Sequence, residues 1–193
     1  MENIPKTNKT KRLLFASFVL PAVILLGMTV KPVITLMTGT PIALKTMPFD
    51  PKSLFYGDYI KLQYEVQQLP ASLFDKAILK KHKAGAFNSS PTTVYIVLEK
   101  KDGNVFEATK VHETKPSEGI YLQGTIEGEP ITDDRSQPPY FNVELNLDTI
   151  SKYYVEEGTG KKLEQQSGQG QLLAHMKWKD GYVILTSVEE WGK

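Results

Sequence analysis

Residues 13–30 read LLFASFVLPAVILLGMTV and contain no charged side chain in 18 consecutive positions. As an α-helix this run is about 27 Å long, close to the roughly 30 Å apolar core of a bilayer. A helix of a soluble protein usually keeps a polar stripe, and this run has none. We therefore predict a transmembrane anchor over residues 13–36, in which the apolar residues after Lys31 supply the remaining length.

The charges around the apolar run are unevenly distributed. Residues 1–12 carry four basic side chains and one acidic side chain, whereas only Lys31 follows the run directly. Basic flanks stay on the cytoplasmic side of a membrane, so we expect a cytoplasmic N-terminus. A cleaved signal peptide is the alternative, but it requires a shorter apolar run and a small-x-small cleavage site. No convincing site of that kind follows Val30.

These observations predict a domain organisation and a location. We expect a single-pass protein of the cell membrane with an uncleaved signal-anchor over residues 13–36. A cytoplasmic tail then occupies residues 1–12, and an extracytoplasmic domain occupies residues 38–193. The lipid bilayer is the first expected partner, through residues 13–36.

Composition excludes several classes of function. The 193-residue chain has 23 lysines and arginines against 22 aspartates and glutamates. This balance argues against a nucleic-acid partner bound through bulk positive charge. The chain contains no cysteine, which excludes disulfide frameworks, thiol nucleophiles and zinc–thiolate sites.

The extracytoplasmic part reads mostly as β-strands. Residues 59–66, YIKLQYEV, alternate so that Ile60, Leu62, Tyr64 and Val66 face one way, which is the period of a half-buried strand. Lys-Asp-Gly before residue 104 and before residue 182 indicates two hairpin turns. Further strands are expected at residues 42–46, 94–99, 105–112, 119–127, 141–147, 171–178 and 182–191.

Two segments have a different period. Residues 70–83 could form a helix, with Gly85 as the stop signal after it and the lysines around His82 at its solvated end. Residues 148–166 read as a short helix, a glycine interruption and a second helical piece. We therefore predict an α+β fold that is mainly antiparallel β, as a sheet or partly closed barrel with one or two short helices, after a single N-terminal transmembrane helix.

Two motifs in the outer domain point to a family. Residues 57–64 read GDYIKLQY, after an Asp50-Pro51 and Leu54 approach, and residues 153–164 read YYVEEGTGKKLE. In this order the two motifs resemble the GDYXXLXY family of membrane proteins. Tyr154 and Glu156 depart from the family pattern, which has phenylalanine and proline there. The replacement of proline removes a fixed φ angle before the glycine turn.

The resemblance implies a location more than an activity. Such proteins are single-pass, extracytoplasmic bacterial proteins of uncharacterised function, associated with polytopic membrane proteins that are themselves uncharacterised. The resemblance implies no reaction, cofactor or catalytic residue. It therefore adds a polytopic membrane protein as a second expected partner.

The motif residues have a structural interpretation and a functional one. In the structural one, Gly57 allows a close approach, Asp58 closes a turn, and Tyr59 and Tyr64 bury their rings while keeping a hydroxyl for a partner. In the functional one, Asp58, Tyr59 and Glu157 converge on one cleft. The candidate site comprises Gly57, Asp58, Tyr59, Leu62, Tyr64, Tyr153, Glu157, Gly158, Gly160 and Glu164.

Templates for catalysis and metal binding are not matched. The histidines, His82, His112 and His175, show no metal-ligand spacing, and no common nucleophile, phosphate or dinucleotide motif is found. Glu157 and Glu164 read as a solvated acidic turn rather than a cation site. We expect no catalytic residue, metal or cofactor, and predict a non-enzymatic interaction or accessory module for a polytopic membrane partner. The alternative is an extracytoplasmic small-ligand binder or an enzyme acting on envelope material.

Overall fold

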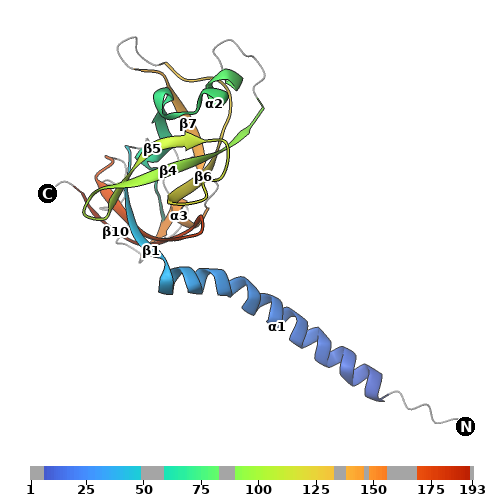
Figure 1. Cartoon of the computed structure of the whole chain (residues 1–193). Coiled ribbons are helices and arrows are strands. Elements are labelled where there is room, and N and C mark those ends of the chain that lie inside the picture. The colour runs from blue at the N-terminus through green and yellow to red at the C-terminus, as the bar shows by residue number, and fades with distance from the viewer. Residues whose placement is uncertain are drawn as a thin grey trace, which may run out of the picture.

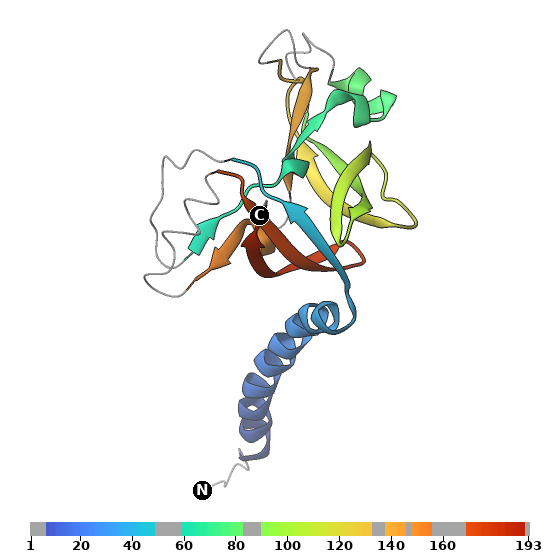
Figure 2. The same ribbon diagram turned by 90° about the vertical axis from the view of Figure 1, so that its left-hand side faces the viewer.

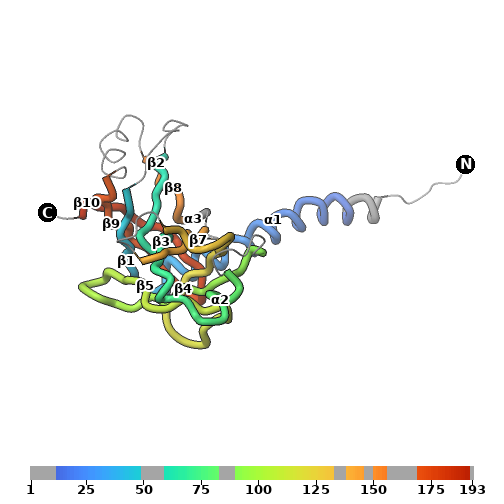
Figure 3. The backbone as a smooth tube through the Cα atoms, turned by 90° about the horizontal axis from the view of Figure 1, so that it is seen from above, coloured from blue at the N-terminus to red at the C-terminus, as the bar shows by residue number. Residues whose placement is uncertain are grey.

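The computed structural model describes residues 7–48, 59–82, 90–132, 138–145, 148–155 and 169–191. An N-terminal helix, α1 (Thr7–Thr38), is followed by a domain built mainly of β-strands. Most of α1 projects away from the strands (Figures 1 and 3). The predicted order of an apolar helix and then a β-rich domain is therefore confirmed.

Helix α1 contains the predicted anchor. Among the described residues, one helix is long and apolar enough to cross a membrane, and it covers Arg12–Thr38. Its large apolar side chains, such as Phe18, Leu25 and Met28, are exposed rather than packed in the protein. By its length and composition this helix is a candidate membrane span.

The β domain is an open sheet of eight strands in the order β10-β9-β1-β5-β4-β6-β7-β3. Neighbouring strands are antiparallel, except that β1 and β5 meet in parallel at Ala43 and Val105. This arrangement confirms the mainly antiparallel prediction as a sheet that is not closed. The strands are β1 (Thr40–Lys45), β3 (Gln68–Pro70), β4 (Thr92–Asp102), β5 (Val105–His112), β6 (Ile120–Ile126), β7 (Tyr140–Leu145), β9 (Leu172–Lys179) and β10 (Tyr182–Glu190).

Shorter elements complete the described domain. A separate ladder pairs β2 (Tyr59–Lys61) with β8 (Lys152–Tyr154). The short helices are η1 (Glu65–Gln67), η2 (Ala71–Leu73), α2 (Lys76–Lys81) and α3 (Asp148–Ser151). The apolar core lies between the curled sheet and these pieces, and it includes Leu44, Tyr64, Ile78, Phe141 and Ile150.

The predicted strand over residues 59–66 is too long. It ends at Lys61, because the Tyr64 backbone N–H donates to Gln67 Oε1 at 2.9 Å and the Gln67 N–H donates to the Tyr64 carbonyl at 2.9 Å. These two bonds close the 3-10 turn η1 in place of a ladder. The predicted alternation of burial is nevertheless correct, since all four even-numbered residues from Ile60 to Val66 are buried.

Two predicted helices also differ from the structure. The segment 70–83 is helical only at η2 and α2, because Phe74 bridges to Val111 and the Asp75 N–H donates to the Val111 carbonyl at 3.1 Å. The short helix after residue 147 exists as α3, but the chain continues directly into strand β8. The predicted second helical piece lies outside the described residues.

One glycine joins the anchor to the sheet. The Gly39 N–H donates to the Thr35 carbonyl at 2.8 Å, and a Cβ atom at Gly39 would lie only 2.4 Å from that same oxygen. Helix α1 therefore passes into β1 through a single residue that has no room for a side chain. Strand β1 leaves the end of the helix directly beneath the hairpin of β9 and β10 (Figure 2).

Candidate functional site

The described parts of the two motif segments are neighbours in space. In the β2–β8 ladder, Tyr59 lies opposite Tyr154 and Ile60 lies opposite Tyr153. The Tyr59 and Tyr154 rings are tilted and their centroids lie 5.7 Å apart. Lys152 Nζ lies 5.1 Å from the centroid of the Tyr59 ring, within the range of a cation–π contact. Two segments that are far apart in the sequence thus form one small aromatic surface.

The last motif residues face the interior instead. The Leu62 N–H donates to the Ser151 carbonyl at 3.0 Å, and the buried Tyr64 hydroxyl donates to the carbonyl of Ile150. Burial raises the pKa of Tyr64 well above its ordinary value, so this hydroxyl stays protonated and remains a donor. Leu62 and Tyr64 therefore hold the motif against α3, as the structural interpretation of the motif predicts.

The two faces of the ladder differ in exposure. Ile60 is buried and Tyr153 packs against the core. Tyr59 is half-buried, whereas Tyr154 is 71% exposed. An exposed tyrosine is not unusual by itself, but a tyrosine pair beside a lysine offers apolar area, hydroxyl groups and a cation at one place. Tyrosine is among the residues that are enriched in protein interfaces.

The structure describes four of the ten predicted site residues. It brings Tyr59 and Tyr153 into one ladder and places Leu62 and Tyr64 in the core beside it. The remaining six, Gly57, Asp58, Glu157, Gly158, Gly160 and Glu164, lie outside the described residues. A shared cleft of Asp58, Tyr59 and Glu157 therefore stays a prediction.

A polar groove begins beside the motif. It has a volume of about 540 Å³ and includes Gln63, a residue of the motif itself. Amide side chains both donate and accept hydrogen bonds, so the groove suits a ligand rich in hydroxyl or amide groups. Sequence reasoning missed it, because its lining comes from separate elements. The lining residues are Met47, Gln63, Gln67, Gln68, Thr125, Glu127, Asn142, Val143 and Glu144.

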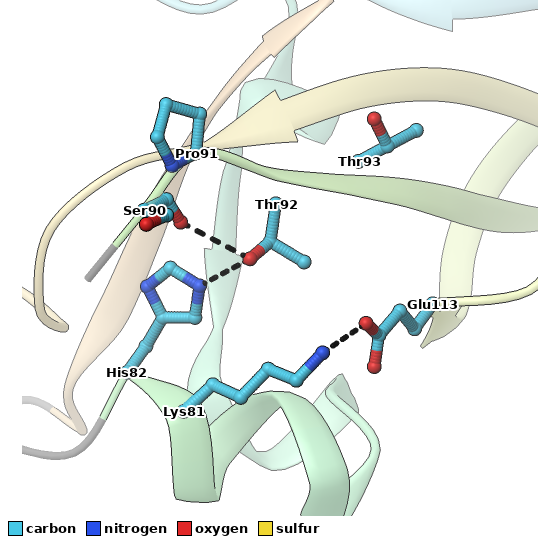
Figure 4. Close-up of a pocket in the computed structure, with 7 residues that line it drawn as sticks. All are labelled: Lys81, His82, Ser90, Pro91, Thr92, Thr93 and Glu113. Atoms are coloured by element: carbon cyan, nitrogen blue, oxygen red, sulfur yellow. Dashed lines mark hydrogen bonds and ion pairs between the residues drawn. The ribbon is translucent and has the colours of Figure 1, made fainter.

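A second hollow lies at the end of α2 and has a volume of about 560 Å³. His82 is fully buried there, with Nδ1 at 2.6 Å from the Gly128 carbonyl and Nε2 at 2.9 Å from Thr92 Oγ1. Since a carbonyl only accepts, Nδ1 carries the proton. Figure 4 shows the ring directed at Thr92, and Lys81 directed at Glu113, with which it forms an ion pair. The sequence predicted His82 at a solvated helix end. The ring is instead buried and lies within hydrogen-bond distance of both the Gly128 carbonyl and Thr92 Oγ1.

The other histidines are paired separately. His112 Nδ1 lies 2.8 Å from Asp75 Oδ2, and His175 Nε2 lies 2.8 Å from Glu189 Oε1. Within the described ranges, no group of three or more histidine, aspartate or glutamate side chains could hold a metal ion.

Comparison with known proteins gives one match. The family model described as GDYXXLXY protein matches residues 21–188. No curated protein and no solved structure matches the chain. The matched range includes the end of α1, both motif segments and nearly all of the β domain.

Proposed function

Since the chain belongs to the GDYXXLXY family, we propose that it is a single-pass membrane protein whose β domain is a non-enzymatic interaction module for a polytopic membrane partner. In this proposal residues 1–12 lie in the cytoplasm, residues 13–36 cross the bilayer, and residues 38–193 lie outside. The protein is then a bacterial signal-anchor protein with an extracytoplasmic accessory domain.

The tyrosine pair of the β2–β8 ladder, in which Tyr154 is exposed and Tyr59 half-buried, carries the proposal. Tyr59 and Tyr154 lie at the one place where the described parts of both motif segments meet. Leu62 and Tyr64 hold this ladder from the core side, so the aromatic surface lies on buried, packed residues. Helix α1 and its one-residue connection at Gly39 would keep that surface at a fixed height above the membrane.

Recovery of a partner tests this proposal. The full chain with a C-terminal tag is cross-linked in cells, extracted in mild detergent and purified, and the retained integral membrane proteins are identified. We expect a polytopic protein that is lost when Tyr154→Ala removes an exposed ring at the centre of the surface. Truncating an aromatic side chain at the centre of an interface costs at least about 1 kcal/mol of binding free energy, so retention of the partner should fall severalfold.

The matched control is Trp191→Ala, which removes another exposed aromatic side chain outside the ladder. It should leave partner recovery unchanged. Equal loss with both variants would indicate nonspecific adhesion. Recovery of no integral membrane protein by the wild-type chain would contradict the proposal.

A second candidate function is binding or processing of a small ligand from the cell envelope, at a site around Asp58, Tyr59 and Glu157. The groove that includes Gln63 is lined by other residues than these three, but its amides and carboxylates suit hydroxyl-rich ligands and so favour ligand binding on this part of the domain. Thermal unfolding of the full chain with soluble cell-wall glycan fragments tests this function. A rise in melting temperature that disappears in Asp58→Asn and Glu157→Gln, but persists in Glu118→Gln, would support it over the first.

A further inference from the structure

The turn between β9 and β10 folds back along the anchor helix. Lys31 Nζ lies 4.7 Å from the centroid of the Tyr182 ring, and Lys179 Nζ donates to Thr38 Oγ1 at 2.9 Å. At 1.5 Å per residue, Lys31 precedes the helix end at Thr38 by about 10 Å. The turn therefore reaches about two helical turns back toward the apolar part of α1.

This geometry places the turn at the membrane surface if α1 is the anchor. Residues 13–30 alone span about 27 Å, nearly the full hydrocarbon core. Lys31 then lies at the start of the headgroup layer, where lysine and tyrosine side chains are favoured. Tyr182 and Lys179 lie beside it, so the hairpin turn shares the headgroup layer with the helix.

A groove of about 330 Å³ runs between the helix and this turn. On the helix, Gly27 and Val30 line the end of the groove that precedes Lys31, and Ile34 and Thr35 line the part beyond Lys31. Gly27 leaves open space beside the helix, since a Cβ atom built there would meet nothing within 4 Å. At the other end the groove is lined by Lys31, Lys179 and Asp180. One end is therefore apolar at bilayer depth, and the other end is charged at headgroup depth.

The charged end has an excess of positive groups. Lys31 and Lys179 face one carboxylate, Asp180, in the lining. That carboxylate also acts on Lys115, whose pKa is raised by its hydrogen bond with Tyr121 first and, as a smaller cause, by Asp180. Lys177 lies nearby and donates to the Gly39 carbonyl at 3.4 Å. Each ammonium has three N–H donors, so the contacts of Lys179 and Lys177 with the helix end leave donors for an anion.

We propose that this groove binds one anionic phospholipid, with an acyl chain along Gly27 and Val30 and the phosphate between Lys31 and Lys179. The proposal rests on membrane insertion of α1, which belongs to the proposed function. A lipid bound here would touch both the anchor and the β domain, and it would fix their relative orientation. The site would therefore make the position of the domain depend on the lipid composition of the facing leaflet.

Native mass spectrometry of the full chain tests the proposal. The protein is released from detergent micelles that contain equal amounts of phosphatidylglycerol and phosphatidylcholine, and the bound lipids are counted. We expect retention of one phosphatidylglycerol. The double variant Lys31→Gln with Lys179→Gln should weaken that binding about tenfold, since each juxtamembrane lysine attracts anionic lipid separately. The matched control, Lys76→Gln with Lys80→Gln, removes two exposed charges from α2, which lies at the other end of the domain (Figure 1).

A second variant tests the acyl end of the groove. Gly27→Leu adds an apolar side chain where a Cβ atom meets nothing within 4 Å, and it should reduce retention of both lipids. Equal retention of the two lipids by the wild-type chain, or equal loss with the α2 control, would overturn the site. So would wild-type retention by Gly27→Leu. Alkaline extraction of cell membranes that contain the full chain separates membrane insertion from the lipid site. A chain that stays in the membrane but shows no lipid preference contradicts only the lipid site.

Discussion

At the scale of single residues, the two motif tyrosines, Tyr59 and Tyr64, differ in burial. Tyr64 is 1% exposed and its hydroxyl donates to the carbonyl of Ile150, whereas Tyr59 is half-buried on the ladder surface. The two residues are only five positions apart and have identical chemistry. Their different surroundings therefore give a direct test of which part of the motif stabilises the fold.

We expect Tyr64→Phe to lower the free energy of unfolding by about 1–3 kcal/mol, because it leaves the buried Ile150 carbonyl without its partner. Tyr59→Phe is the matched control, and it keeps the ring that contacts Tyr154. Its effect should be within about 0.5 kcal/mol, as is usual for surface changes. Urea unfolding of the full chain in mild detergent measures both. Equal destabilisation by the two variants would show that the hydroxyl of Tyr64 has no special role.

At the scale of elements, the sequence predicted strands where alternation and hairpin turns agree. The predicted strand 105–112 has the bounds of β5, and the second Lys-Asp-Gly turn is found where both Asp180 and Gly181 have positive φ, at 51° and 82°. Positive φ at two successive residues is the requirement of a tight hairpin turn. Local chemistry was sufficient in these places.

Elements that depend on distant partners could not be predicted. Strand β8 was expected to be helical, since nothing within residues 148–166 indicates that β2 will pair with it. The segment before α2 bridges to Val111 instead of continuing as a helix. For the site, the period of two correctly placed Leu62 and Tyr64 inside. The groove beside Gln63 and the groove beside Lys31 each combine separate elements, so no local pattern could indicate them.

The contact between β1 and β5 is the parallel step in an otherwise antiparallel sheet, with a register of one pair at Ala43 and Val105. An ion-pair cluster supports this step, because Glu107 contacts Lys101 and also Lys45 Nζ, at 3.3 Å. The hydrogen bond with Lys101 first, and then that with Lys45, lower the pKa of Glu107 below its ordinary 4.5. The cluster links the two halves of the sheet across their narrowest ladder.

We expect Glu107→Gln to reduce stability at pH 7 by at most about 1 kcal/mol, since the pairs are partly exposed to solvent. A lowered pKa in the folded state favours folding above the unfolded value and loses this effect as the pH falls through the folded value. Wild type and variant should therefore differ at pH 7 and converge at acidic pH. Urea unfolding at several pH values measures this. Glu118→Gln removes an exposed carboxylate that has no ion pair in the described part of the chain, and it should show no such convergence.

At the scale of the whole molecule, helix α1 contacts the β domain at Gly39 and at the β9–β10 turn. The helix end is held by the Gly39 N–H, by Lys179 and by Lys177. Positive side chains at the C-terminal end of a helix also interact favourably with its dipole. If α1 spans a membrane, these contacts would restrict rotation of the domain about the helix. The tyrosine pair and the groove between α1 and the β9–β10 turn would thus keep constant heights relative to the bilayer.

The orientation of the whole molecule gives a final prediction, which the absence of cysteine makes simple to test. Single substitutions Asn8→Cys and Ser117→Cys place one thiol before the apolar run and one on an exposed loop of the β domain. The positive-inside rule places the first in the cytoplasm and the second outside. A membrane-impermeant maleimide should therefore label Ser117→Cys in intact cells, and should label Asn8→Cys only after permeabilisation. The cysteine-free chain supplies the background. The reverse pattern would place the tyrosine pair and the lipid groove on the cytoplasmic side, which would contradict the proposed orientation.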